Sequence, residues 1–395
     1  MQYRKFGKLD FKVSALGFGA MRLPVKEHKV DEPEAIKMIR YAIDHGVNYV
    51  DTAYAYHDGD SELVVGKALK DGYREKVKLA TKMPVWKVET AADFDLYLNE
   101  QLSKLQVDQL DFYLLHSMNK NNWPRIRDLG IIEWFDKAMA DGRIRYPAFS
   151  FHGELETFKE IIDSYPWPMC LIQYNYMDIE NQAGTAGLRY AAEKGTAVAI
   201  MEPLLGGNLA IPPASIEPIW DKAQRKRNPV EWALQWLWNQ PEVAVVLSGM
   251  STLEQVKDNI SYAGRSEIGV LTPAELAIFD EVRTRYEELT TIPCTDCGYC
   301  MPCPQNVDIP QNIANYNNGI MFDQYDTSRG KYKWWKHVYD SNGFLQQDIR
   351  AANCISCGEC EEKCPQGIPI SRWMPVIHEV FDQKKPFVKK LDEQE

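Results

Sequence analysis

Residues 47–82 read VNYVDTAYAYHDGDSELVVGKALKDGYREKVKLATK, a short apolar run, a polar turn, an amphipathic segment and a second apolar run. The apolar runs, 47–53 and 77–82, contain the β-branched residues that strands favour. Apolar residues in the segment between them recur at helical spacing. This order predicts a strand–helix–strand unit with parallel strands.

The same alternation continues on both sides of this stretch, from about residue 13 to residue 262. Eight strand–helix units over about 250 residues predict a (β/α)₈ TIM barrel. A doubly wound sheet is the competing α/β fold, but LGFGAM (16–21) lacks the GxGxxG turn that such sheets place after the first strand. The predicted strands are 13–19, 47–53, 77–82, 110–116, 146–152, 171–176, 197–202 and 243–249, and the predicted helices are 33–46, 61–72, 92–106, 131–142, 155–165, 187–195, 229–240 and 252–260.

The two ends of this region predict additional elements. Residues 2–16, QYRKFGKLDFKVSAL, predict a hairpin around Gly7-Lys8 that plugs the barrel floor. Residues 272–289 predict one further helix, after which the composition changes. We therefore expect a barrel domain at 1–290 and a smaller second domain at 291–395.

Composition and charge exclude several classes of protein. With 45% hydrophobic and 26% charged residues, the chain has the composition of a globular protein rather than a disordered one. Its net charge of −11 argues weakly against nucleic acid or an anionic membrane as partner. We expect no transmembrane helix, because no apolar run reaches ~18 residues, and no signal peptide, because the first residues lack an apolar core.

Eight of the nine cysteines lie after residue 290, which is unlike a disulfide-stapled secreted protein. They form two runs, each followed by proline, and the second has the C-x₂-C-x₂-C-x₃-C-P spacing of bacterial ferredoxins. Two C-x₂-C pairs also suit zinc, but evenly spaced triples followed by Cys-Pro favour iron–sulfur clusters. The runs are Cys294, Cys297, Cys300 and Cys303, then Cys354, Cys357, Cys360 and Cys364.

In two-cluster ferredoxins the fourth cysteine of each run binds the other cluster. We therefore predict two [4Fe–4S] clusters in a ferredoxin-like domain, and the clusters in turn predict a reducing, cytoplasmic location. The Tyr- and Trp-rich insert between the runs predicts either a helical cover or a docking segment. One cluster is assigned to Cys294, Cys297, Cys300 and Cys364, and the other to Cys354, Cys357, Cys360 and Cys303.

Four polar residues follow the second, third and fourth predicted strands: Asp51, Tyr56, Lys82 and His116. In a TIM barrel, the carboxyl ends of the strands carry the chemistry. A Lys ammonium pairs with a carboxylate and lowers the pKa of a neighbouring phenol, so that the Tyr can donate a proton to a carbonyl oxygen. His116 is expected to orient that carbonyl.

The chain resembles the aldo/keto reductase family. The motifs that carry the resemblance are GFGAM (17–21), GVNYVDTAYAY (46–56), SELVVGKAL (61–69), ATK (80–82), DFYLLH (111–116), IQYNY (172–176) and STLEQVKDN (251–259). It implies a catalytic tetrad of Asp51, Tyr56, Lys82 and His116 that acts on a small carbonyl substrate. Tyr54 is the rival proton donor, and the family's spacing of five from the Asp selects Tyr56.

The resemblance also implies NADPH or NADH, bound across the barrel mouth. Ser150 and Gln173 would hold the nicotinamide amide, and Met201 stands where many members stack a Tyr on the ring. Many NADPH-preferring members carry Lys and Arg in the loop after the eighth strand, where this chain has Gly249 and Gln255. The residues expected to take the adenosine end are Gly249, Met250, Ser251, Gln255 and Asn259.

A barrel of this family with a C-terminal ferredoxin-like domain resembles a bacterial and archaeal subfamily. The clusters predict one of three roles: a structural lid, a relay to a ferredoxin or flavoprotein, or a site linked to the barrel through a flavin or a substrate radical. A function of another class, a redox-sensing or electron-transfer module on a barrel without reductase activity, stays open.

Overall fold

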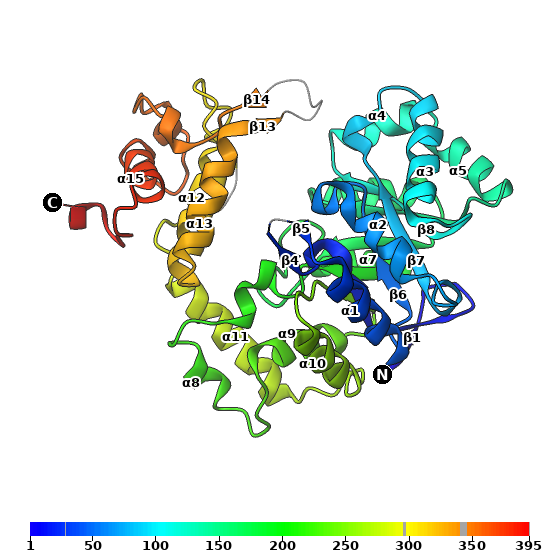
Figure 1. Cartoon of the computed structure of the whole chain (residues 1–395). Helices are drawn as coiled ribbons and strands as arrows, with labels where there is room; N and C mark the ends of the chain where they lie inside the picture. The colour runs from blue at the N-terminus through cyan, green and yellow to red at the C-terminus, as the bar shows by residue number, and fades with distance from the viewer. Residues whose placement is uncertain (28, 295–297, 340–345, 395) are drawn as a thin grey trace. The chain divides into compact units, whose positions relative to one another are not determined.

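The computed structural model describes residues 1–27, 29–294, 298–339 and 346–394 (Figure 1). The chain divides into two compact units, Met1–Gly207 with Arg227–Pro273, and Asn208–Lys226 with Ala274–Glu395. The barrel lies in the first unit. The second contains the cysteine runs and helix α11 (Pro273–Glu288), which confirms the predicted helix at 272–289. A domain boundary at residue 290 stays a prediction.

Eight parallel strands close into a barrel in the order β10-β11-β12-β3-β6-β7-β8-β9. Each predicted strand region contributes one of them, so the TIM-barrel prediction is confirmed and the doubly wound sheet is excluded. The strands are β3 (Leu16–Gly19), β6 (Tyr49–Asp51), β7 (Lys78–Met83), β8 (Leu110–Met118), β9 (Ile144–Phe151), β10 (Met169–Gln173), β11 (Ala197–Met201) and β12 (Val243–Ser248).

All eight predicted barrel helices are present, and α4 (Asn122–Asp128) and α8 (Glu217–Trp220) are additional short ones. Polar side chains cap three of the eight: Asp31, Asn228 and Thr252 each accept an N–H from the first turn that follows. The eight are α1 (Glu32–Asp44), α2 (Asp60–Ala68), α3 (Ala92–Leu105), α5 (Ile131–Ala140), α6 (Leu155–Ser164), α7 (Gly184–Glu193), α9 (Pro229–Trp238) and α10 (Leu253–Ala263).

The predicted N-terminal hairpin is confirmed as β1 (Tyr3–Lys5) paired with β2 (Lys12–Ser14). Phe6 lies in the barrel interior, with its ring centroid 5.2 Å from that of Phe112. Gly7 adopts a φ of +56°, and a Cβ there would lie 2.7 Å from the backbone of Ala197. The hairpin therefore closes the floor of the barrel by close backbone approach.

The single strand predicted over 13–19 is wrong at Ala15. The Ala15 N–H donates to Gln2 O, and the Ser14 hydroxyl donates to Leu16 O at 2.6 Å. These bonds divide the segment between the hairpin and β3. A second small hairpin, β4 (Val25–Lys26) with β5 (Lys29–Val30), follows.

In the second unit, α12 (Ile309–Met321), α13 (Tyr325–Trp334) and α15 (Ile370–Asp382) pack around an apolar core of their own. The helical insert between the cysteine runs is thus confirmed. The short elements are α14 (Glu359–Glu362), β13 (Val338–Tyr339) and β14 (Gln346–Gln347). Within the described residues, no helix is both long and apolar enough to cross a membrane.

Candidate active site and cysteine cavities

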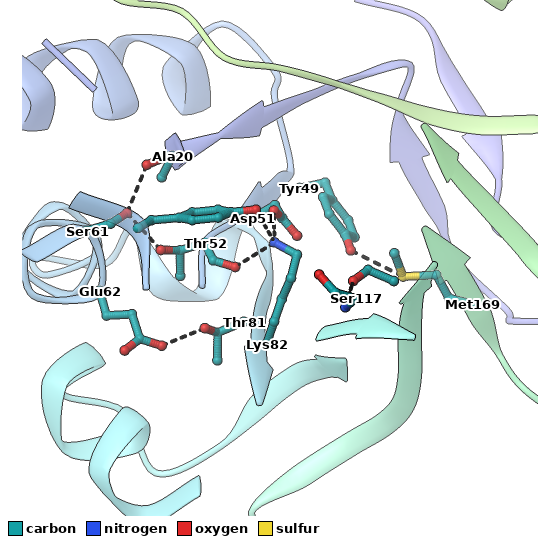
Figure 2. Close-up of polar contacts among 12 residues, drawn as sticks. Ala20, Tyr49, Asp51, Thr52, Ser61, Glu62, Thr81, Lys82, Ser117 and Met169 are labelled. Carbon is teal, nitrogen blue, oxygen red and sulfur yellow. Dashed lines mark hydrogen bonds and ion pairs between the residues drawn. The ribbon is translucent and has the colours of Figure 1, made fainter. Parts of the chain in front are cut away.

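Three of the predicted catalytic side chains meet at Lys82, near the carboxyl end of β7. Its ammonium donates to Asp51 Oδ1 at 2.5 Å, to Thr52 O at 2.8 Å and to the Tyr56 hydroxyl at 3.1 Å. Figure 2 shows Lys82 directed at Asp51 and Thr52. Strand β6 pairs in register with β7, so Asp51 and Lys82 reach the same end of the barrel.

Burial and charge set the ionisation of this group. Burial alone would lower the pKa of Lys82, but the Asp51 carboxylate and the Tyr56 hydroxyl raise it above its ordinary value. Burial also raises the pKa of Tyr56, and the opposing effect of Lys82 is smaller. Our expectation of a net lowered phenol pKa is therefore wrong. These raised pKa values keep the Tyr56 hydroxyl protonated and the Lys82 ammonium charged at pH 7.

His116 lies beside Tyr56, with the two ring centroids 5.9 Å apart and nearly perpendicular. The ring of Trp86 lies 5.1 Å from His116 on another side. Burial, together with the charge of Lys82, holds the pKa of His116 well below its ordinary value. The imidazole is therefore neutral. Its Nδ1 is buried and has no hydrogen-bond partner among the described residues.

The loop after β6 separates Tyr56 from its rival Tyr54. The Tyr54 hydroxyl donates to Glu100 Oε2 at 3.3 Å, and its ring lies under the ammonium of Lys104. Beyond Tyr56, His57 has a φ of +52°, and its Nε2 accepts the Leu23 N–H at 3.0 Å. This bond ties the Tyr56 loop to the loop after β3.

Beneath Lys82 lies a buried polar network that our sequence reasoning missed. Glu62 of α2 accepts from Thr81 Oγ1 at 2.6 Å (Figure 2). It also accepts from Gln101 Nε2 at 2.5 Å. Gln101 of α3 also donates to Lys82 O at 3.0 Å and accepts from the Tyr113 hydroxyl at 2.7 Å. Two helices thereby fix the backbone that carries Lys82.

A second histidine near the mouth was also missed. His152 follows β9 directly, and its N–H donates to Met118 O at 2.9 Å. Burial lowers its pKa, while a hydrogen bond to Gln182 and the charge of Glu202 act in the opposite direction. A polar residue placed directly after a predicted strand, as for His116, is the signal that would have identified it.

The residues predicted to hold the nicotinamide lie at neighbouring strand ends. Ser150 of β9 is buried, and its hydroxyl accepts the Ser117 N–H at 2.8 Å. Gln173 of β10 pairs in register with Met201 of β11. Its amide donates to Asp178 Oδ2 at 2.8 Å and accepts from Gln182, so its plane is fixed.

The residues predicted for the adenosine end surround the start of α10. The Ser251 N–H donates to Gln255 Oε1 at 2.8 Å, and Asn259 donates to Ser248 Oγ at 3.1 Å, so Gln255 and Asn259 shape the loop. Met250 is buried, whereas Gly249 is exposed. A Cβ at Gly249 would lie 3.2 Å from the side chain of Arg22, a basic residue that sequence reasoning overlooked here.

Apolar residues that follow the first, third and fourth predicted strands predict an apolar lining of the mouth: Met21, Trp86, Met118 and Trp123. Two of the four, Met118 and Trp123, lie elsewhere. Met118 pairs with Phe151 beyond an irregularity in β8, and its side chain is fully buried in the core. Trp123 is buried in the same core. Of the apolar residues expected to line a pocket, Trp86 contacts His116, and Met21 is 52% exposed.

The second unit has two cavities that draw cysteines from both runs. One is lined by Cys303 of the first run together with Cys354, Cys357 and Cys360 of the second. Its remaining walls include Val307, Ile309, Ile370 and Met374, and the Ser356 N–H donates to Cys354 Sγ at 3.4 Å. Thiolates, apolar walls and an amide directed at sulfur fit an iron–sulfur cluster.

The other cavity is lined by Cys294, Cys300 and Cys364. Cys297, the remaining predicted ligand, lies outside the described residues. Cys300, Ile309 and Ile370 line both cavities, so the two are adjacent. No group of three or more His, Cys, Asp or Glu side chains in the described part of the chain converges on one metal ion, and the cysteines surround cavities instead. The ninth cysteine, Cys170, is buried in β10.

Comparison with known proteins identifies the first unit. The model of the aldo/keto reductase family matches residues 15–284. The chain belongs to this family. A second model, of a 4Fe–4S dicluster domain, matches residues 293–368, so this aldo/keto reductase carries a C-terminal iron–sulfur domain, as the cysteine spacing predicted.

Individual relatives agree with this assignment. A probable aldo-keto reductase 1 of Glycine max is 33% identical over 155 residues, an alignment that covers 37% of this chain and 44% of that protein. The holo form of aldo-keto reductase AKR11C1 from Bacillus halodurans is 28% identical, with a TM-score of 0.62, and covers 71% of this chain and 96% of that one. An aldo/keto reductase from Klebsiella pneumoniae, in complex with NADP and acetate, is 25% identical, with a TM-score of 0.59, over 71% of this chain and 95% of its own. The chain is thus an oxidoreductase of this family.

Proposed function

We propose that this enzyme reduces the carbonyl group of a small aldehyde or ketone with NADPH or NADH, and that Tyr56 supplies the proton. The observation that carries the proposal is the buried Lys82 ammonium, which contacts both Asp51 and Tyr56 at the barrel mouth. A bound nicotinamide would supply the hydride to the carbonyl carbon.

The side chains at the barrel mouth would supply the proton and orient the substrate. Tyr56 donates its hydroxyl proton to the carbonyl oxygen as negative charge develops there. Lys82 stabilises the phenolate that remains, and Asp51 keeps Lys82 charged and directed at Tyr56. The neutral His116 donates a hydrogen bond from its ring to the carbonyl oxygen and so orients it.

The residues predicted to bind the nicotinamide lie on the neighbouring strands β9, β10 and β11, which supports a common binding site. Ser150 and Gln173 would hold the nicotinamide amide, with Met201 against the ring. The loop Gly249–Ser251 opens an eleven-residue helix, whose first amides suit a phosphate. Arg22 beside Gly249 adds a cation at this loop, and we therefore favour NADPH over NADH.

For the second unit, we propose two [4Fe–4S] clusters that act as an electron relay. The adjacency of the two cavities supports a relay, because they share three lining residues. The proposed partners are a small carbonyl substrate and a ferredoxin or flavoprotein, and the proposed location is the reducing cytoplasm. We propose neither nucleic acid nor a membrane as partner.

The direct test is an anaerobic assay of NADPH and NADH oxidation by the purified holoenzyme against a panel of aldehydes and ketones. We expect carbonyl-dependent oxidation of at least one cofactor. If no carbonyl is turned over while iron and sulfide are stoichiometric, the alternative of an electron-transfer module without reductase activity would replace this proposal.

The pH profile follows from the two buried rings. Tyr56 must be protonated to act, and its pKa is raised, so kcat/KM should stay high through neutral pH and fall only above about pH 10. The pKa of His116 is well below its ordinary value, so no loss should occur between about pH 6 and pH 8. A break in kcat/KM near pH 6.5 would contradict the neutral His116.

The crossed cysteines make a separate prediction. Cys303→Ser should remove the one first-run cysteine that we assign to the cluster of the second run, in the cavity that Cys354, Cys357 and Cys360 also line. The first predicted cluster would persist, so iron should fall to about half of the wild-type content, because each [4Fe–4S] cluster takes four thiolates. Cys170→Ser is the matched control, because Cys170 lies in the barrel core. Unchanged iron and EPR intensity in Cys303→Ser would reject the crossing.

A further inference from the structure

Helix α13 and the turn η6 (Trp335–His337) present an exposed basic and aromatic face in the second unit. Trp334 is 84% exposed, the most of any large apolar side chain in the described residues. On the other side of the helix, Ser328 and Tyr332 are buried in the core. We call this the α13 face, and it consists of Lys331, Lys333, Trp334, Lys336 and His337, all exposed.

The α13 face opposes the charge of the whole chain. Residues 325–337 contain four Lys and Arg side chains and one Asp, whereas the net charge of the chain is −11. Arg329 forms an ion pair with Asp326 at 3.3 Å. Lys331 and Lys333 form no ion pair with any residue that the structure describes. Within the described residues, no ion pair neutralises their positive charge.

Two hydrogen bonds connect helix α13 and the turn η6 to the loop that carries Cys354. The Tyr332 hydroxyl accepts the Ala352 N–H at 3.0 Å, and the Ile349 N–H donates to Trp335 O at 3.1 Å. The Cys354 N–H in turn donates to Ala351 O at 3.0 Å. The elements that carry the α13 face are thus hydrogen-bonded to the loop whose Cys354 lines the cavity with Cys303.

We propose that the α13 face docks an acidic protein that carries one electron at a time. The inference rests on the proposed function, because it requires a redox-active cluster in the adjacent cavity. In each encounter the reduced carrier loses one electron and the oxidised cluster gains it, and no bond forms or breaks.

The chemistry of the α13 face favours this occupant. Clustered lysines attract an acidic partner and accelerate its association. A tryptophan is a frequent anchor of binding energy at protein interfaces. Electron-transfer interfaces are small and bury less than about 1,200 Å² of surface in total. One helix face and the residues around it can supply such an area. A nucleic acid would need several phosphate contacts against the strong net negative charge of the chain.

The test uses the full-length anaerobic holoprotein and a reduced acidic [2Fe–2S] ferredoxin as the probe. Stopped-flow absorbance follows cluster reduction, and thermophoresis measures binding of the oxidised ferredoxin. For Lys331→Glu/Lys333→Glu we expect a fall of about 10-fold or more in the second-order rate constant and a flatter dependence on salt. Trp334→Ala should weaken binding about 10-fold. The control, Lys70→Glu/Lys137→Glu, makes the same charge change at exposed lysines of the first unit and should behave as wild type.

Dithionite is a small reductant that needs no docking surface. It therefore tests whether the clusters can be reduced separately from whether the α13 face docks a protein. Normal reduction by dithionite with ferredoxin rates equal to wild type in all variants would overturn the docking site and leave the clusters redox-active. Clusters that neither reductant reduces would overturn the relay itself, and the docking site with it. A change in NADPH-driven carbonyl reduction without ferredoxin, in the α13 variants alone, would identify the barrel of this chain as the occupant and also overturn the proposal.

Discussion

Tyr56→Phe is expected to lower kcat/KM for carbonyl reduction by about 10²–10⁴-fold, the usual contribution of a positioned general acid. The substitution removes the hydroxyl that Lys82 contacts at 3.1 Å and leaves the ring beside His116. Binding of NADPH should change little, since the proposed cofactor residues lie on other strands. Steady-state kinetics and a fluorescence titration with NADPH measure the two quantities.

Tyr54→Phe is the matched control. Its hydroxyl donates to Glu100 at the rim and does not contact Lys82, so activity should stay within about 3-fold of wild type. Equal losses of kcat/KM in Tyr54→Phe and Tyr56→Phe would contradict the assignment of Tyr56, rather than Tyr54, as the proton donor. Activity of Tyr56→Phe near that of wild type would show that another group supplies the proton.

Lys82→Met is expected to lower the free energy of unfolding at pH 7 by about 3–5 kcal/mol, the cost of leaving one member of a buried ion pair alone. Lys82 and Asp51 are both almost completely buried, and Lys82 contacts Asp51 Oδ1. Asp51 Oδ2 has no hydrogen-bond partner among the described residues. Carbonyl reduction should be lost as well, because Tyr56 loses its contact with a cation. Chemical denaturation and the carbonyl assay measure the two effects.

The pH dependence of this variant distinguishes a buried charge from a packing defect. Burial already raises the pKa of Asp51, and loss of Lys82 would raise it further. A carboxyl whose folded-state pKa lies above the unfolded value favours the folded state as pH falls, so Lys82→Met should regain stability from pH 7 toward pH 5. Lys82→Met/Asp51→Asn should be more stable at pH 7 than the single variant. Equal stability of the two variants would mean that packing, not charge, causes the loss.

The features predicted from sequence were those set by local pattern and by barrel geometry. Short apolar runs alternate along the chain with segments whose apolar residues recur at helical spacing. This alternation is enough to locate the eight strands. The meeting of Asp51, Tyr56 and Lys82 follows from topology, since parallel strands bring their carboxyl ends to one mouth. The crossed cysteine sets were predicted from the ferredoxin-like spacing. The described cysteines of each predicted set line one cavity, and Cys300 lines both cavities, so the crossing stays a prediction.

What sequence reasoning missed depends on contacts between distant segments. Glu62 and Gln101 are polar residues on two different helices, and only packing shows that they hold one strand together. The direction of the pKa shift of Tyr56 was predicted wrongly. Burial, which a sequence does not report, raises this pKa by more than the charge of Lys82 lowers it. Arg22 reaches Gly249 across more than two hundred residues of chain.

The interleaved cavities have a consequence for biogenesis. Cys303 completes the lining that the second run begins, and Cys364 joins that of the first. Ile370 lines both cavities, so neither lining is complete until the chain has been translated past both runs. A protease cut or a premature stop between residues 304 and 353 would disable both linings together, and only a chain translated past both runs can mature fully.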